Sequence, residues 1–158
     1  MPSNQSSPAV SWLMSINAKV SIAAVLSFHW CVFWLLNGFD KFFNADHFFG
    51  ANFKALLEND LLGRLDLDSS LAWPIAIIVG ICELILGLAF LFALIAALGR
   101  KAETVKLIGV CVTLSVLFFA LLSAGAVLFG ARDALQQHGV FIAALLASQF
   151  VVSSVSSD

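Results

Sequence analysis

Four long apolar segments constrain the fold of this chain more than any other feature. They lie at residues 20–43, 73–98, 105–131 and 138–155. Each reaches the roughly 18 to 20 residues that a helix needs to cross a hydrocarbon core of about 30 Å. Backbone groups in lipid must be satisfied within the chain, and these segments show no alternation with a period of two, so helices are required and a barrel is excluded. The predicted fold is therefore all-α, a four-helix transmembrane bundle.

Composition supports this class of protein. Of the 158 residues, 61% are hydrophobic and only 11% are charged, which lies well outside the range of soluble domains. The formal net charge of −2 provides no basic surface for nucleic acid. We expect a polar N-terminal tail over residues 1–18, then a single membrane domain over residues 19–158 that contacts lipid.

The distribution of basic residues predicts an orientation. The short connection GRKAETVK between the second and third segments holds Arg100, Lys101 and Lys106. By the positive-inside rule this connection is expected in the cytoplasm, together with both termini. The predicted location is a bacterial cytoplasmic (inner) membrane, with the connection between the first two segments outside.

That external connection carries an amphipathic pattern. Its apolar residues recur at helical spacing, and charged residues between them argue against a fifth span. We expect a helix that caps the bundle or lies in the interface, and a partner protein could bind the same stripe. The residues of the stripe are Phe48, Phe49, Phe53, Leu56, Leu57, Leu61, Leu62 and Leu65.

Glu83 is the single charge within the second segment. It lies about 15 Å along the helix from Trp73, near the middle of the bilayer. A bare charge at that depth costs from about 2.5 to more than 10 kcal/mol, so Glu83 should face the bundle interior and be protonated or paired. Small residues that share its helical face would let a neighbouring helix approach closely. These predicted packing residues are Ala76, Gly80 and Gly87.

Polar residues on other segments are candidate partners of Glu83. His29 lies about 15 Å from Lys19 by helical rise, at a matching depth, so we expect it to bind Glu83 directly or through one water. On the same segment, Asn37 and Asp40 extend a polar stripe towards the external side, with Lys41 on its flank. Thr113, Ser115 and Gln149 offer polar groups at similar depth, although such residues commonly serve only helix packing. The candidates for a quinone or proton site are Glu83, His29, Asn37, Asp40, Lys41 and Gln149.

Several other chemistries find no motif in the sequence. Haem between helices would need facing histidines, whereas His47 and His138 are expected near the external boundary. The three cysteines stand on different segments without a C-x-x-C pair. The chain also lacks a P-loop, a dinucleotide fingerprint and zinc-ligand spacing. We therefore assign no catalytic residue and no metal site.

Three sequence stretches together resemble the DoxX/DoxD-like family of small four-span membrane proteins. They are LLNGFDKFF, IAIIVGICELILGLAFLFALIAALGR and LQQHGVFIAALL. The similarity runs from about Lys19 to Val152 and includes a G-x-x-K pattern ending at Lys41. The family often has a lysine at the start of the fourth helix, where this chain has Gln137 and His138. Because the family is named for a subunit of a thiosulfate:quinone oxidoreductase, the resemblance implies a membrane subunit of a quinone-linked oxidoreductase.

The sequence is compatible with three functions. In the first, the polar residues at the depth of Glu83 contact quinone or protons within an oxidoreductase assembly. The chain carries no motif for an electron-carrying cofactor, so other redox subunits would have to supply it, and the chain is at most one subunit of an enzyme. In the second, the chain is a structural or assembly subunit of a larger membrane complex. In the third, it is a small transporter or proton conductor, which the lack of an inverted repeat disfavours.

Overall fold

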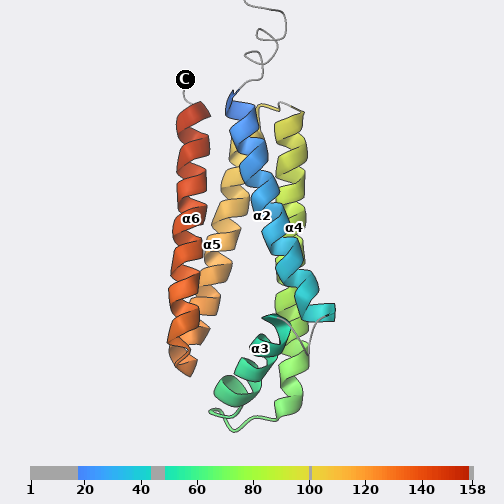
Figure 1. Cartoon of the computed structure of the whole chain (residues 1–158), viewed down its shortest axis with the longest axis vertical. Helices are drawn as coiled ribbons and strands as arrows, with labels where there is room; N and C mark the ends of the chain where they lie inside the picture. The colour runs from blue at the N-terminus through green and yellow to red at the C-terminus, as the bar shows by residue number, and fades with distance from the viewer. Residues whose placement is uncertain (1–17, 44–48, 100, 157–158) are drawn as a thin grey trace, which may run out of the picture.

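A computed structural model describes residues 18–43, 49–99 and 101–156. It contains four long helices that run up and down in chain order: α2 (Ala18–Phe43), α4 (Ala72–Leu98), α5 (Thr104–Phe129) and α6 (Arg132–Ser156) (Figure 1). All four are long and apolar enough to cross a membrane. The predicted all-α bundle of four membrane-length helices is confirmed. The predicted tail falls outside the described residues apart from Ala18.

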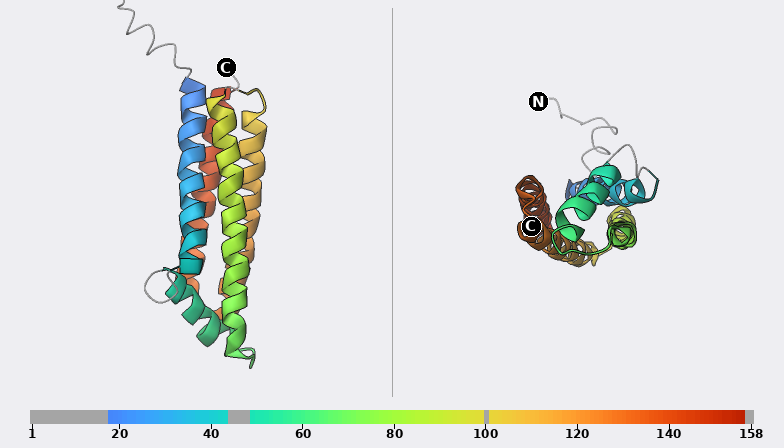
Figure 2. Two further views of the ribbon diagram at one scale, coloured as in Figure 1. Left: turned by 90° about the vertical axis from the view of Figure 1, so that its right-hand side faces the viewer. Right: turned by 90° about the horizontal axis from the view of Figure 1, so that it is seen from below.

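Short helices cover one end of the bundle. α3 (Phe49–Leu56) continues directly into a π-helix, η1 (Leu57–Leu62), and a 3₁₀ turn, η2 (Ser69–Leu71), leads into α4. Figure 2 shows these elements crossing the bundle at what we call the α3 end. The Asp68 side chain accepts a hydrogen bond from the backbone N–H of Ser70, which caps η2 and lowers the pKa of the Asp68 carboxyl.

Apolar side chains attach this cap to the bundle. Leu57 and Leu62 are buried and pack with Ala72 and Ala76 at the start of α4. Phe53 packs against the same group. The expected capping role of the segment is confirmed for these side chains, whereas the side chain of Phe49 lies outside the described residues.

α2 and α4 are staggered along their common axis. A Cβ added at Gly87 would lie 2.7 Å from the Leu35 side chain, and one added at Gly80 would lie 3.2 Å from the Lys41 Cβ. Since Lys41 is level with Gly80, α2 ends about 10 Å short of the start of α4. α3 and η1 occupy the space that this stagger leaves beside α4 (Figure 1).

The core between the helices is rich in aromatic rings. Trp34 and Phe90 are almost completely buried, and Trp34 packs against Phe119 with ring centroids 4.9 Å apart. Trp30 donates a hydrogen bond of 3.1 Å from Nε1 to Ser148 Oγ, which links α2 to α6. Aromatic packing and one polar link therefore join the first helix to the two that close the bundle.

Candidate functional site

Glu83 forms a buried ion pair with Lys41. Lys41 Nζ of α2 donates a hydrogen bond of 2.6 Å to Glu83 Oε2 of α4, and the two residues are 9% and 5% exposed. Side chains on a helix lean towards its N-terminus, and α2 and α4 are antiparallel. Lys41 therefore leans into the bundle, Glu83 leans towards the α3 end, and their charged groups meet.

The prediction that His29 pairs with Glu83 is wrong. His29 is exposed on the outside of α2, where its ring meets Trp30 edge-on at 5.1 Å. Trp30 packs near Phe90, which lies about 10 Å along α4 from Glu83. The prediction failed because it measured depth from segment ends that were assumed to be level. The stagger of the helices brings Lys41, near the end of α2, to the depth of Glu83.

The Lys41 ammonium is enclosed by further groups. Its Nζ lies 3.5 Å from the backbone oxygen of Asn37 and 5.3 Å from the centroid of the Phe53 ring, a cation–π contact with the cap. The Asn37 side chain donates from Nδ2 to the backbone oxygen of Phe33 at 2.8 Å. A carboxylate, a carbonyl and an aromatic face therefore surround the Lys41 ammonium.

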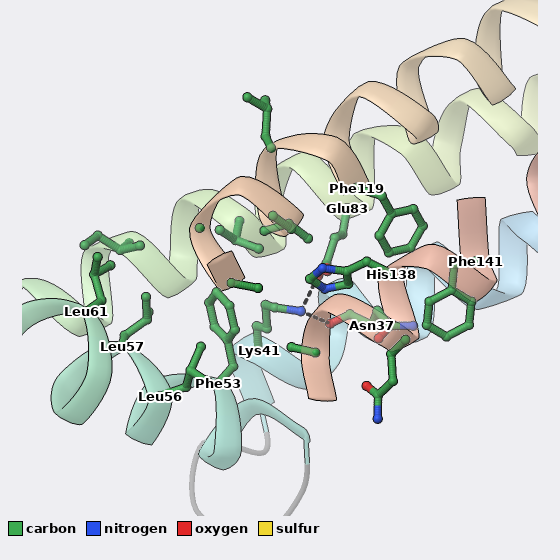
Figure 3. Close-up of a pocket in the computed structure, with 18 of the residues that line it drawn as sticks. Asn37, Lys41, Phe53, Leu56, Leu57, Leu61, Glu83, Phe119, His138 and Phe141 are labelled. Carbon is green, nitrogen blue, oxygen red and sulfur yellow. Dashed lines mark hydrogen bonds and ion pairs between the residues drawn. The ribbon is translucent and has the colours of Figure 1, made fainter. Parts of the chain in front are cut away.

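The ion pair lines a cavity of about 340 Å³. This volume lies within the range of roughly 300 to 1,000 Å³ that is usual for small-molecule sites. Side chains from α2, α3, η1, α4, α5 and α6 form its walls, and most of them are aliphatic or aromatic (Figure 3). The aromatic walls are Phe33, Trp34, Phe53, Phe119 and Phe141, and the polar groups are Asn37, Lys41, Glu83, Gln137 and His138.

His138 was missed as a site residue by the sequence reasoning. α6 begins at Arg132, so His138 lies more than one turn inside the helix and reaches the cavity that holds the ion pair (Figure 3). Its ring packs on Phe119 at 5.7 Å, and its Nδ1 is buried without a hydrogen-bond partner among the described residues. Two residues in the sequence indicate the true start of α6. Gly130 ends α5, where the structure gives it a φ of +75°, and the acidic Asp133 lies in the first turn of α6.

The structure brings together three of the six candidate residues: Glu83, Asn37 and Lys41. His29 faces outward, and the half-buried Asp40 does not line the cavity. Gln149 lies on α6 towards the other end of the bundle, where it packs against Gly109 and donates to Ser153. These three residues are not part of the cavity.

Comparison of the chain with protein-family models, with curated proteins and with solved structures finds no match. Among the described residues, no group of three or more His, Cys, Asp and Glu side chains is placed to hold a metal ion. The site is therefore defined by its own geometry: a buried ion pair, a histidine and two amides around an aromatic cavity within four membrane-length helices.

Proposed function

We propose that this chain is a membrane subunit that binds the head group of a quinone-type molecule in the cavity beside Lys41 and Glu83. The observation that carries the proposal is the position of the ion pair on the wall of an aromatic cavity. A pair that served only to hold α2 against α4 could be packed on all sides. Here both charged side chains line an open volume.

The charges and rings of the cavity favour a neutral, planar head group. Lys41 and Glu83 neutralise each other, so a neutral ligand leaves no uncompensated charge in a low-dielectric environment. The Phe141 ring centroid lies 4.9 Å from that of Phe33. The Phe141 ring is also stacked on Phe119, with ring centroids 5.4 Å apart and an interplanar angle of 17°. Such walls suit an aromatic ring, Glu83 and Asn37 can accept hydrogen bonds from hydroxyl groups on it, and His138 can donate to or accept from its oxygens.

The resemblance to DoxX/DoxD-like proteins supports a quinone-linked oxidoreductase assembly as the setting. In this proposal the chain supplies the head-group site, and partner subunits supply the electron carrier. Glu83 and His138 are the side chains that could exchange a proton with a bound head group. The proposal is supported by the position of the cavity among four candidate membrane spans, because a lipid-soluble ligand would reach it from the membrane.

Binding can be measured with the whole protein in lipid nanodiscs. A short-chain ubiquinone analogue is titrated in its oxidised and reduced forms, and quenching of the intrinsic tryptophan fluorescence is followed. We expect saturable quenching that Ala134→Phe weakens at least tenfold, because Ala134 lines the cavity and a phenyl group would fill part of it. Ala143→Phe, on the exposed side of the same helix, is the matched control. The proposal would be refuted if, for both the oxidised and the reduced analogue, quenching does not saturate or is unaffected by Ala134→Phe.

A further inference from the structure

Two acceptor oxygens beside the ion pair have no hydrogen-bond partner among the described residues. Glu83 uses Oε2 to bind Lys41, and its second carboxylate oxygen, Oε1, accepts no hydrogen bond from them. Asn37 binds the Phe33 carbonyl, and only an NH₂ group can do this, so the orientation of the amide is fixed. Its Oδ1 is therefore an acceptor, and it accepts no hydrogen bond from the described residues.

The nearby donors are engaged, buried, or on side chains that can also accept a hydrogen bond. The Lys41 ammonium donates to Glu83 and to the Asn37 carbonyl and lies over the Phe53 ring. Trp34 also lines the cavity, and its Nε1 donor has no partner among the described residues but is buried. Histidine and glutamine side chains can each donate or accept, so His138 and Gln137 suit either kind of ligand oxygen.

We infer that this site binds the reduced, hydroxyl-bearing head group, a quinol, more tightly than the oxidised quinone. This inference rests on the proposed function and adds the chemical form of the ligand. A quinol O–H can donate to Glu83 Oε1 or Asn37 Oδ1, and its ring fits the same aromatic walls. A quinone has only carbonyl acceptors, so it would set oxygen against oxygen at these positions. A hydrogen bond to a charged group, left unmade, weakens binding by about tenfold or more.

Three matched ligands test this inference in anaerobic nanodiscs: a short-chain hydroquinone, the corresponding quinone, and the hydroquinone dimethyl ether. The dimethyl ether keeps the aromatic ring and the oxidation level but has no O–H group. We expect the hydroquinone to bind at least tenfold more tightly than either of the others. Equal or tighter binding of the quinone or of the ether would overturn the inference.

Two variants test whether the preference for hydroquinone over quinone depends on the acceptors of Glu83 and Asn37. Glu83→Gln exchanges an acceptor for a group that can also donate, so the hydroquinone-to-quinone affinity ratio should fall several-fold. Asn37→Leu removes the second acceptor and leaves the ion pair in place, so it provides the same test if Glu83→Gln does not fold. Ala143→Phe should keep the wild-type ratio. An unchanged ratio in both acceptor variants would overturn the inference.

The inference and the proposed function can fail separately. Saturable quinone binding that Ala134→Phe weakens, without a preference for the hydroquinone, would remove the inference and leave the proposed function standing. If none of the three ligands binds in a way that Ala134→Phe weakens, both are refuted.

Discussion

Removing the cation of the buried pair should destabilise the protein in a pH-dependent way. Lys41→Met keeps the length of the side chain but leaves Glu83, which is 5% exposed, without its counter-charge. Breaking a buried pair typically costs about 3 to 5 kcal/mol. Uptake of a proton by Glu83 limits that cost, because protonating a carboxyl of ordinary pKa near 4.3 at pH 7 costs about 3.7 kcal/mol. We therefore expect a loss of about 3 to 4 kcal/mol in the free energy of unfolding at pH 7.

The loss should shrink as the pH falls. At pH 5 the same protonation costs only about 1 kcal/mol, so the variant should recover up to about 2.7 kcal/mol relative to the wild type. The sign follows from linkage: the folded variant binds a proton that its unfolded state does not hold, so acid favours the folded form. Glu83→Gln should lose less, because Lys41 is two residues from the end of α2 and its ammonium can extend towards the membrane surface.

The assay is denaturant unfolding in mixed micelles followed by tryptophan fluorescence. Trp30 and Trp34 are at most 2% exposed and report on the core. Lys54→Met is the control. Lys54 and Glu58 form a partly exposed pair at 3.7 Å one helical turn apart, and the loss of this pair should cost less than about 0.5 kcal/mol. A loss below about 1 kcal/mol for Lys41→Met at pH 7, or a loss equal at pH 7 and pH 5, would contradict the reasoning.

Three further predictions concern helix packing, orientation and a turn. Gly87→Ala should cost about 1 to 3 kcal/mol in the same titration, because its Cβ would lie 2.7 Å from Leu35, whereas Gly139→Ala, with nothing within 4 Å, should be neutral or stabilising; equal effects would argue against the close approach of α2 and α4. Single cysteines at positions 101 and 59 of a cysteine-free chain should react with an impermeant thiol reagent from opposite sides of the membrane, and reaction from one side would reject the predicted topology. Gly130→Ala should lower the free energy of unfolding by about 1 to 2 kcal/mol, because φ at Gly130 is +75°; a change below about 0.5 kcal/mol would contradict this.

The helices and the burial of Glu83 could be predicted because both follow from local energetics. A long apolar segment in lipid has few alternatives to a helix, so segment length determines the element. A carboxylate among small residues at mid-depth has to face other helices, whatever its partner. Neither argument requires knowledge of which helices are neighbours.

The partner of Glu83 could not be predicted in the same way, because it depends on how far one helix is shifted along another. The close fits of Gly80 against Lys41 and of Gly87 against Leu35 set that shift, and they involve the facing surfaces of two helices. A count of residues from the ends of one segment contains no such information. The count therefore favoured His29 and placed Lys41 on the flank of the polar stripe.

The cavity was beyond sequence reasoning for a related reason. Its walls come from six helical elements, and the cap closes over it only because α2 ends short of α4. The periodicity of the cap indicated an apolar face but not the empty volume beneath it. His138 was placed at a helix start because the polar first turns of α6 were assigned to the preceding connection.

Replacing both members of the ion pair together separates a structural role from a binding role. If Lys41 and Glu83 only hold α2 against α4, an apolar pair of similar volume should do so as well, because replacing a buried ion pair by apolar residues is often neutral or stabilising by about 1 to 4 kcal/mol. We expect the free energy of unfolding of Lys41→Met/Glu83→Leu to be higher than that of the wild type or at most about 1 kcal/mol lower. The same variant should bind hydroquinone at least tenfold more weakly. Stability as low as that of Lys41→Met alone would show that the two charges do not act as a pair. Wild-type hydroquinone affinity in a stable double variant would show that the pair takes no part in the site, and the acceptor at Glu83 would then have no role in choosing the ligand.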